Sequence, residues 1–82
     1  MLKSIHTYQH KQLLALLREI RLEAGLTQTQ LAKYLNTDQT VISKIESGER
    51  RVDVLELREI CKAVGITLEA FVRKLEKSLK SH

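Results

Sequence analysis

The sequence predicts an all-α fold in which five helices, joined by short connections, form one domain over residues 1–82. Apolar side chains recur at helical spacing in five separate segments. Four of these segments begin at Thr or Asp, and four are followed by Gly or Asn, which favour helix starts and ends respectively. No segment alternates between apolar and polar residues as a half-buried strand does. The five apolar stripes must therefore share one core.

The first helix is predicted from about Tyr8 to Ala24, with Gly25 at the position of a C-terminal cap. Its apolar stripe consists of Leu13, Leu14, Leu17 and Ile20. The second helix begins at Thr27, which forms a capping-box pattern with Gln30. In that pattern each side chain satisfies a free backbone N–H group of the first turn. The inner face of this helix consists of Leu31, Ala32 and Leu35.

Asn36 follows the second helix, and after Gly this is the residue type that best tolerates a left-handed backbone. The third helix is expected to begin at Asp38, because a carboxylate suits both an N-terminal cap and the helix dipole. Gly48 ends this helix. Its apolar side is formed by Val41, Ile42 and Ile45.

Asp53 and Glu56 form a second capping-box pattern, which opens the fourth helix, and Gly65 ends it. The apolar residues of the fourth helix are Leu55, Leu57, Ile60, Cys61 and Val64. Thr67 caps the fifth helix, which is predicted over about residues 67–79. This last helix carries Leu68, Phe71, Val72, Leu75 and Leu79.

Composition narrows the function classes. The 14 Lys and Arg residues against 10 Asp and Glu give a net charge of +4, which suits nucleic acid or an anionic membrane surface as a partner. Aromatic residues make up only 4%, which disfavours a surface that stacks single-stranded bases. The single cysteine excludes an internal disulfide and favours the reducing cytoplasm. No apolar run is long enough to predict a membrane helix or a secretory signal.

Residues 27–47 place two short helices next to each other, and neither is long enough to be stable alone. Two such helices, joined by a tight turn and buried on one side, make a helix-turn-helix. In this arrangement the second helix enters the major groove of DNA, so it needs an apolar back and short polar side chains near its N-terminus. Ile42 and Ile45 supply the back. The polar side chains are Gln39, Thr40, Ser43 and Lys44.

The segment "GLTQTQLAKYLNTDQTVISKIESGERRVDVLELREICKAVGITLEAF" resembles the phage repressor and Cro-like (Xre-type) DNA-binding family. The combination of "LTQ…LA…L", "ISKIESGER" and "L…I…A.G…LE" carries this resemblance, which runs from the first helix to Phe71. It implies a lambda-repressor-like five-helix domain. Asn36 stands where the family usually has Gly, and Thr37 where it usually has an apolar residue; a turn tolerates both. Stand-alone members of this size resemble restriction–modification controller proteins, prophage regulators and antitoxins.

The resemblance implies a role for several side chains. Gln28 would meet a phosphate and brace Gln39. The residues facing base edges would be Gln39, Thr40 and Lys44, and further phosphate contacts would come from Ser43, Arg50 and Arg51. Arg21 and Glu46 match a pair that forms a salt bridge between the first and third helices in many relatives. No metal or other cofactor is implied.

One recognition helix reads only a few base pairs, so we expect a homodimer that reads a palindromic operator. The fifth helix is the expected dimerisation helix, because its apolar stripe is wider than a lone amphipathic helix requires. The expected interface residues are Leu68, Val72 and Leu79. In the alternative, the first helix covers this stripe, with Leu16 as the contact. The sequence leaves both arrangements open.

Other interpretations stand beside these. Without the surrounding motif, a Gln, Thr, Ser and Lys face would be an ordinary solvated surface, and Arg50 and Arg51 ordinary loop charges. His6 and His10 have the spacing of a metal-binding pair but lack a third ligand. Cys61 lies on an apolar stripe and is expected to be an inert core residue. No nucleophile motif, phosphate-binding loop or distinctive carboxylate pair predicts an enzyme. An antitoxin or interaction scaffold of the same fold, with a protein as its main partner, remains the alternative function.

Overall fold

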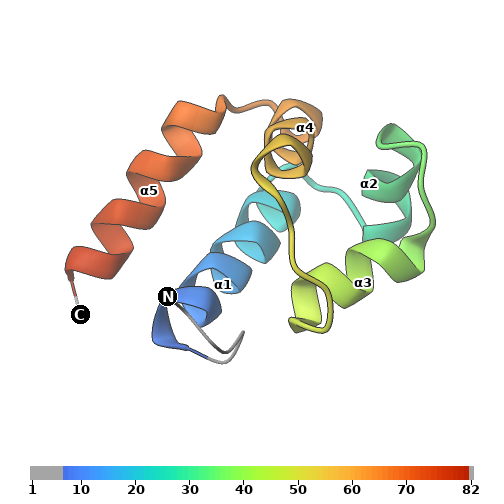
Figure 1. Cartoon of the computed structure of the whole chain (residues 1–82). Coiled ribbons are helices and arrows are strands. Elements are labelled where there is room, and N and C mark those ends of the chain that lie inside the picture. The colour runs from blue at the N-terminus through green and yellow to red at the C-terminus, as the bar shows by residue number, and fades with distance from the viewer. Residues whose placement is uncertain (1–6, 82) are drawn as a thin grey trace.

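The computed structural model describes residues 7–81, and five helices account for most of them (Figure 1). The all-α prediction is confirmed. The helices are α1 (Tyr8–Glu23), α2 (Gln28–Tyr34), α3 (Gln39–Ser47), α4 (Val54–Val64) and α5 (Leu68–Lys80). The α2 and α3 helices lie on one side of α1, and α5 lies on its other side, as Figure 1 shows. The α1 helix therefore lies between α3 and α5.

Side-chain caps fix where the helices begin. Thr27 and Gln30 form the predicted capping box at the start of α2, and Asp53 and Glu56 form the other at the start of α4. Within the described residues, Asp38 makes no such bond, although it does hold the N-cap position of α3. The expected contribution of its carboxylate as a hydrogen-bonding cap was therefore wrong, while the predicted start of the helix was right.

One residue with a left-handed backbone lies before α3 and another lies after it, and the two reverse the direction of the chain at these points. Asn36 has φ of 54°, as its place after α2 predicted, and Gly48 has φ of 87°. The reversal at Asn36 lets the N–H of Thr37 donate to the carbonyl of Ala32 over 3.0 Å, which closes the end of α2. The chain can therefore turn within a few residues from one short helix into the next.

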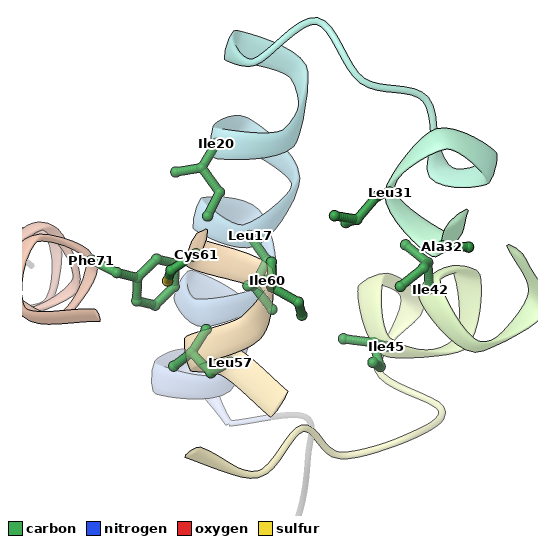
Figure 2. Close-up of a cluster of buried hydrophobic side chains, with 10 residues drawn as sticks. All are labelled: Leu17, Ile20, Leu31, Ala32, Ile42, Ile45, Leu57, Ile60, Cys61 and Phe71. Atoms are coloured by element: carbon green, nitrogen blue, oxygen red, sulfur yellow. The ribbon is translucent and has the colours of Figure 1, made fainter. Parts of the chain in front are cut away.

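All five helices contribute to one hydrophobic core, in which α1 and α4 occupy the middle (Figure 2). Phe71 of α5 and Cys61 of α4 are completely buried members of this core. Burial raises the pKa of the Cys61 thiol, so little of it ionises and the residue is a core residue, as expected. The remaining buried apolar residues are Leu17, Ile20, Leu31, Ala32, Ile42, Ile45, Leu57 and Ile60.

Leu55 departs from the prediction. It was placed on the apolar stripe of the fourth helix, yet 72% of its surface is exposed. Each residue of an α-helix advances about 100°, so Leu55 lies roughly 200° around the axis from Leu57 and faces away from the core. Leu16, the expected contact of the first helix in the alternative arrangement, packs against the core, and Leu22 is exposed.

Residues 7–81 contain neither a membrane-spanning helix nor a cluster of metal-binding side chains. None of their helices is long and apolar enough to cross a membrane. No group of three His, Cys, Asp or Glu side chains in this range could hold a metal ion. His6, one half of the His6 and His10 pair weighed as metal ligands, lies outside the described residues.

Candidate nucleic-acid interface

The α2 and α3 helices form the predicted helix-turn-helix. Their contact depends on a small residue, because Ala32 is only 2% exposed and allows α3 to approach α2 closely. Ile42 and Ile45 form the buried back of α3, at 2% and 4% exposure. The hydrophobic core thereby holds α3 by one face and leaves the opposite face in solvent.

The outward face of α3 carries the side chains that the sequence assigned to base and phosphate contacts. Gln39, Thr40 and Lys44 are exposed, and Ser43 is half-buried. Gln39 and Thr40 occupy the first turn, and the other two residues follow one turn later. This arrangement presents amide, hydroxyl and ammonium groups together, which can donate to and accept from base edges in a major groove.

A chain of hydrogen bonds starts at this face and continues into the protein. The Nε2 group of Gln39 donates to Oε1 of Gln28 over 2.7 Å. The Nε2 group of Gln28 donates to Oε1 of Glu46 over 3.0 Å. Glu46 in turn accepts from Arg21, through Nε at 2.7 Å and Nη2 at 3.0 Å. The structure thus connects the exposed amide of Gln39 to a guanidinium group in the interior.

The Arg21 and Glu46 side chains, which the resemblance paired, are brought together and are only 7% and 9% exposed. The third hydrogen bond of the guanidinium goes from Nη1 to the carbonyl of Leu26, over 2.8 Å. One Arg residue of α1 therefore holds both α3 and the connection that leads into α2. Charge-assisted, bidentate contacts of this kind restrict geometry strongly, so they fix how the helix-turn-helix sits on the core.

The two Arg residues after α3 differ in their surroundings. Arg51 is exposed. Arg50 makes a bidentate contact with Glu56, at 3.2 and 2.5 Å, and also donates to the carbonyl of Arg51. The hydrogen bond to Arg50 is the main reason that the pKa of Glu56 is lowered, and the backbone N–H of Asp53 adds to it. The same bond raises the pKa of Arg50.

Sequence reasoning missed two of these connections. It treated Glu46 as the partner of Arg21 alone, although Glu46 also accepts from Gln28. It treated Arg50 as a phosphate contact alone, although Glu56 binds it. The sequence does show that Glu56, six residues after Arg50, belongs to a capping box at the start of the fourth helix. That spacing alone does not show that the side chains of Arg50 and Glu56 meet.

Comparison with known proteins adds a family assignment. The helix-turn-helix family model HTH_3 matches residues 17–71, which include the buried pair and the whole of α2 and α3. The chain belongs to the Xre-type helix-turn-helix family. The resemblance inferred from the motif is thereby confirmed. The family is one of non-enzymatic DNA-binding regulators, which agrees with the prediction that the chain is not an enzyme.

The chain is similar in sequence or structure to three members of this family. The control protein C.MunI from Mycoplasma sp is 36% identical over 62 residues, which are 74% of this chain and 84% of that protein. The XRE-family like protein from Pseudomonas syringae pv. tomato str. DC3000 has a TM-score of 0.82 and 42% identity, with 90% of each chain covered. The restriction–modification controller protein C.Esp1396I has a TM-score of 0.84 and 31% identity, with 94% and 100% covered.

Proposed function

We propose that this protein is a sequence-specific, double-stranded-DNA-binding transcriptional regulator that acts as a homodimer on a palindromic operator. The observation that carries the proposal is the geometry of α3. Its apolar back is buried, its outer face is polar and exposed, and Gln39 on that face is held in place by Gln28. A side chain that is already ordered loses less conformational entropy when it binds a base.

In this proposal α3 lies in the major groove, and Gln39, Thr40 and Lys44 face the bases. A Gln side chain suits adenine and a Lys side chain suits guanine. The phosphate contacts come from Gln28, Ser43, Arg50 and Arg51. Gln28 has one N–H to spare for a phosphate, because its amide nitrogen carries two hydrogens and one of them goes to Glu46.

Arg50 and Arg51 contribute differently to the phosphate contacts. The Arg50 guanidinium is held by Glu56, so part of its charge is already neutralised and its main effect is to fix the loop between α3 and α4. Arg51 is exposed and follows Arg50 in that loop. We therefore assign to Arg51 the larger share of the electrostatic attraction to the DNA backbone.

The proposed dimer forms through α5. This helix lies on the other side of α1 from α3, so a second copy can bind it without blocking the recognition face (Figure 1). Val72 is 44% exposed and provides the apolar centre of the contact. Leu68 and Leu79 are half-buried, and Leu68 also packs against the core, so they form the edges. The α1 helix packs beside α5, where Gln12 accepts a hydrogen bond from Ser78, and leaves Val72 uncovered.

The kind of regulator is supported by the relatives. Two of the three are named as control or controller proteins, and one of them as a restriction–modification controller. We propose a controller role of the same kind for this chain. An antitoxin or scaffold whose main partner is a protein would not need Gln39, Thr40 and Lys44 together on an exposed helix face, so the structure favours DNA as the partner.

Selection from random duplex DNA, followed by salt titration of the selected site, tests this function. We expect a two-fold symmetric site with half-sites about 10 base pairs apart. Arg51→Ala should lower the slope of log affinity against log salt by about 0.9, the value for one lost phosphate contact. Arg58→Ala serves as the control, because Arg58 is an exposed cation on α4, outside the proposed recognition and dimer helices. Recovery of no sequence above random would refute the proposed function.

A further inference from the structure

The hydrogen-bond chain from Glu46 to Gln39 has a direction as well as a geometry. Each link joins one side-chain oxygen to one amide group, in the order Glu46, Gln28 and Gln39. An amide has an accepting end and a donating end, whereas an ionised carboxylate only accepts. The carboxylate of Glu46, at one end of this series of hydrogen bonds, can therefore decide which end of the Gln28 amide, and then of the Gln39 amide, points towards it.

The Glu46 carboxylate fixes which end of the Gln28 side-chain amide faces it. The Oε1 atom of Glu46 lies 3.0 Å from the Gln28 amide, so Gln28 must present its NH₂ group there. The opposite orientation would place two accepting oxygens against each other, in a part of the protein where Glu46 is only 9% exposed. The oxygen of Gln28 consequently points to Gln39.

The same reasoning then applies to Gln39. Its amide lies 2.7 Å from the oxygen of Gln28, so it must present its NH₂ group to that oxygen. One N–H and the carbonyl oxygen of Gln39 remain for a base. Adenine offers the matching pair, an N6–H donor next to the N7 acceptor. Guanine offers two acceptors, N7 and O6, so the oxygen of Gln39 would face another oxygen.

We propose that Glu46 is a positioning residue for base preference: acting through Gln28, it fixes the orientation of the Gln39 amide so that Gln39 selects adenine over guanine. This inference rests on the proposed function, in which Gln39 reads a base. It adds that a residue with no contact to DNA determines the choice, because a carboxylate imposes its hydrogen-bonding direction on two successive amides.

Gln28→Lys is the decisive variant, because it leaves both Arg21 and Glu46 in place. A Lys side chain only donates. It satisfies Glu46 and turns the Gln39 oxygen towards itself, which leaves both N–H groups of Gln39 for the base. At the position read by Gln39, we expect the preference to change from adenine to guanine. Each preference should be about 5- to 150-fold, the range for one bidentate base contact.

Two further selections establish which side chain causes the change. Gln39→Ala in the otherwise unchanged protein identifies the position that Gln39 reads, because only that position loses its preference. Gln28→Lys combined with Gln39→Ala should show no preference there. If guanine is still preferred in the double variant, Lys at position 28 reads the base directly and the inference is overturned.

Glu46→Gln and Arg21→Lys form a matched pair that separates orientation from stability. Glu46→Gln allows either end of the amide to face Gln28, so the adenine-to-guanine ratio should fall towards one. Arg21→Lys weakens the same buried pair but keeps the carboxylate, so the ratio should stay as in the wild type. Thermal unfolding of both variants confirms that each is folded during binding. A ratio that falls equally in both variants makes Glu46 merely structural and overturns the inference.

Failure of the inference and failure of the proposed function give different results. If Gln39→Ala changes no position of the selected site, Gln39 reads no base, and both the proposed base contact and the inference fail. If Gln39→Ala relaxes one position but Gln28→Lys retains adenine there, the base contact stands and only the role of Glu46 is refuted.

Discussion

We expect that breaking the buried ion pair between Arg21 and Glu46, by replacing one partner, lowers the free energy of unfolding by several kcal/mol. Replacing Glu46 with Leu removes both carboxylate oxygens that the guanidinium binds, and within residues 7–81 it leaves Arg21 with the carbonyl of Leu26 as its acceptor. The Arg21 side chain is only 7% exposed, so water cannot take over the lost contacts without rearrangement. A charge left unpaired in this way typically costs about 3–5 kcal/mol.

The size of this cost matters because the domain is small. A chain of 82 residues is expected to have a free energy of unfolding of roughly 4–12 kcal/mol. One substitution at the pair would thus remove a large part of the total. The double variant, Arg21→Met with Glu46→Leu, should recover much of the loss, because apolar residues that replace a whole buried pair are often neutral or stabilising by about 1–4 kcal/mol.

Urea unfolding followed by circular dichroism measures the four free energies of this double-mutant cycle. We expect a coupling on the order of 3 kcal/mol or more. The control is the pair between Lys62 and Glu59 on α4, outside the proposed dimer helix, which is 58% and 54% exposed and should show a coupling of about 0.2–1 kcal/mol. If the buried pair couples no more strongly than this exposed one, Arg21 does not hold the helix-turn-helix on the core.

Two other predictions concern the dimer and the loop after α3. Val72→Glu should give a folded monomer in sedimentation at micromolar concentration, with weaker operator binding; if it stays dimeric and Leu55→Glu instead dissociates it, the interface lies on α4. Because the pKa of Glu56 is lowered in the folded protein, its ionised form adds stability above its ordinary pKa of 4.5, and that stability is lost as the pH falls through the lower folded-state value. Glu56→Gln should therefore be less stable than the wild type at pH 7 in urea unfolding, and the gap should narrow on acidification. A gap that does not change with pH would show that the Arg50 contact contributes nothing through charge.

The positions of the helices could be predicted from the sequence because they depend on local interactions. A capping box joins residues three apart, as Thr27 and Gln30 show, and a left-handed residue such as Asn36 depends on its own backbone. The 3.6-residue period of apolar side chains is equally local. The motif in α2 and α3 then placed the polar face of Gln39, Thr40 and Lys44 on the second short helix. Leu55 is the exception, because an apolar residue two positions before Leu57 faces away from the core, and only the angular position of each residue around the helix axis shows this.

The tertiary structure alone decided how side chains from different helices meet. Glu46 lies 25 residues from Arg21 and 18 from Gln28, and nothing in those separations shows that one carboxylate binds both. The contact between Arg50 and Glu56 likewise depends on how the chain turns between α3 and α4. A side-chain hydrogen bond forms only within a few tenths of an ångström and a narrow range of angles. The packing of the helices sets those distances, so the network that orients Gln39 became visible only in three dimensions.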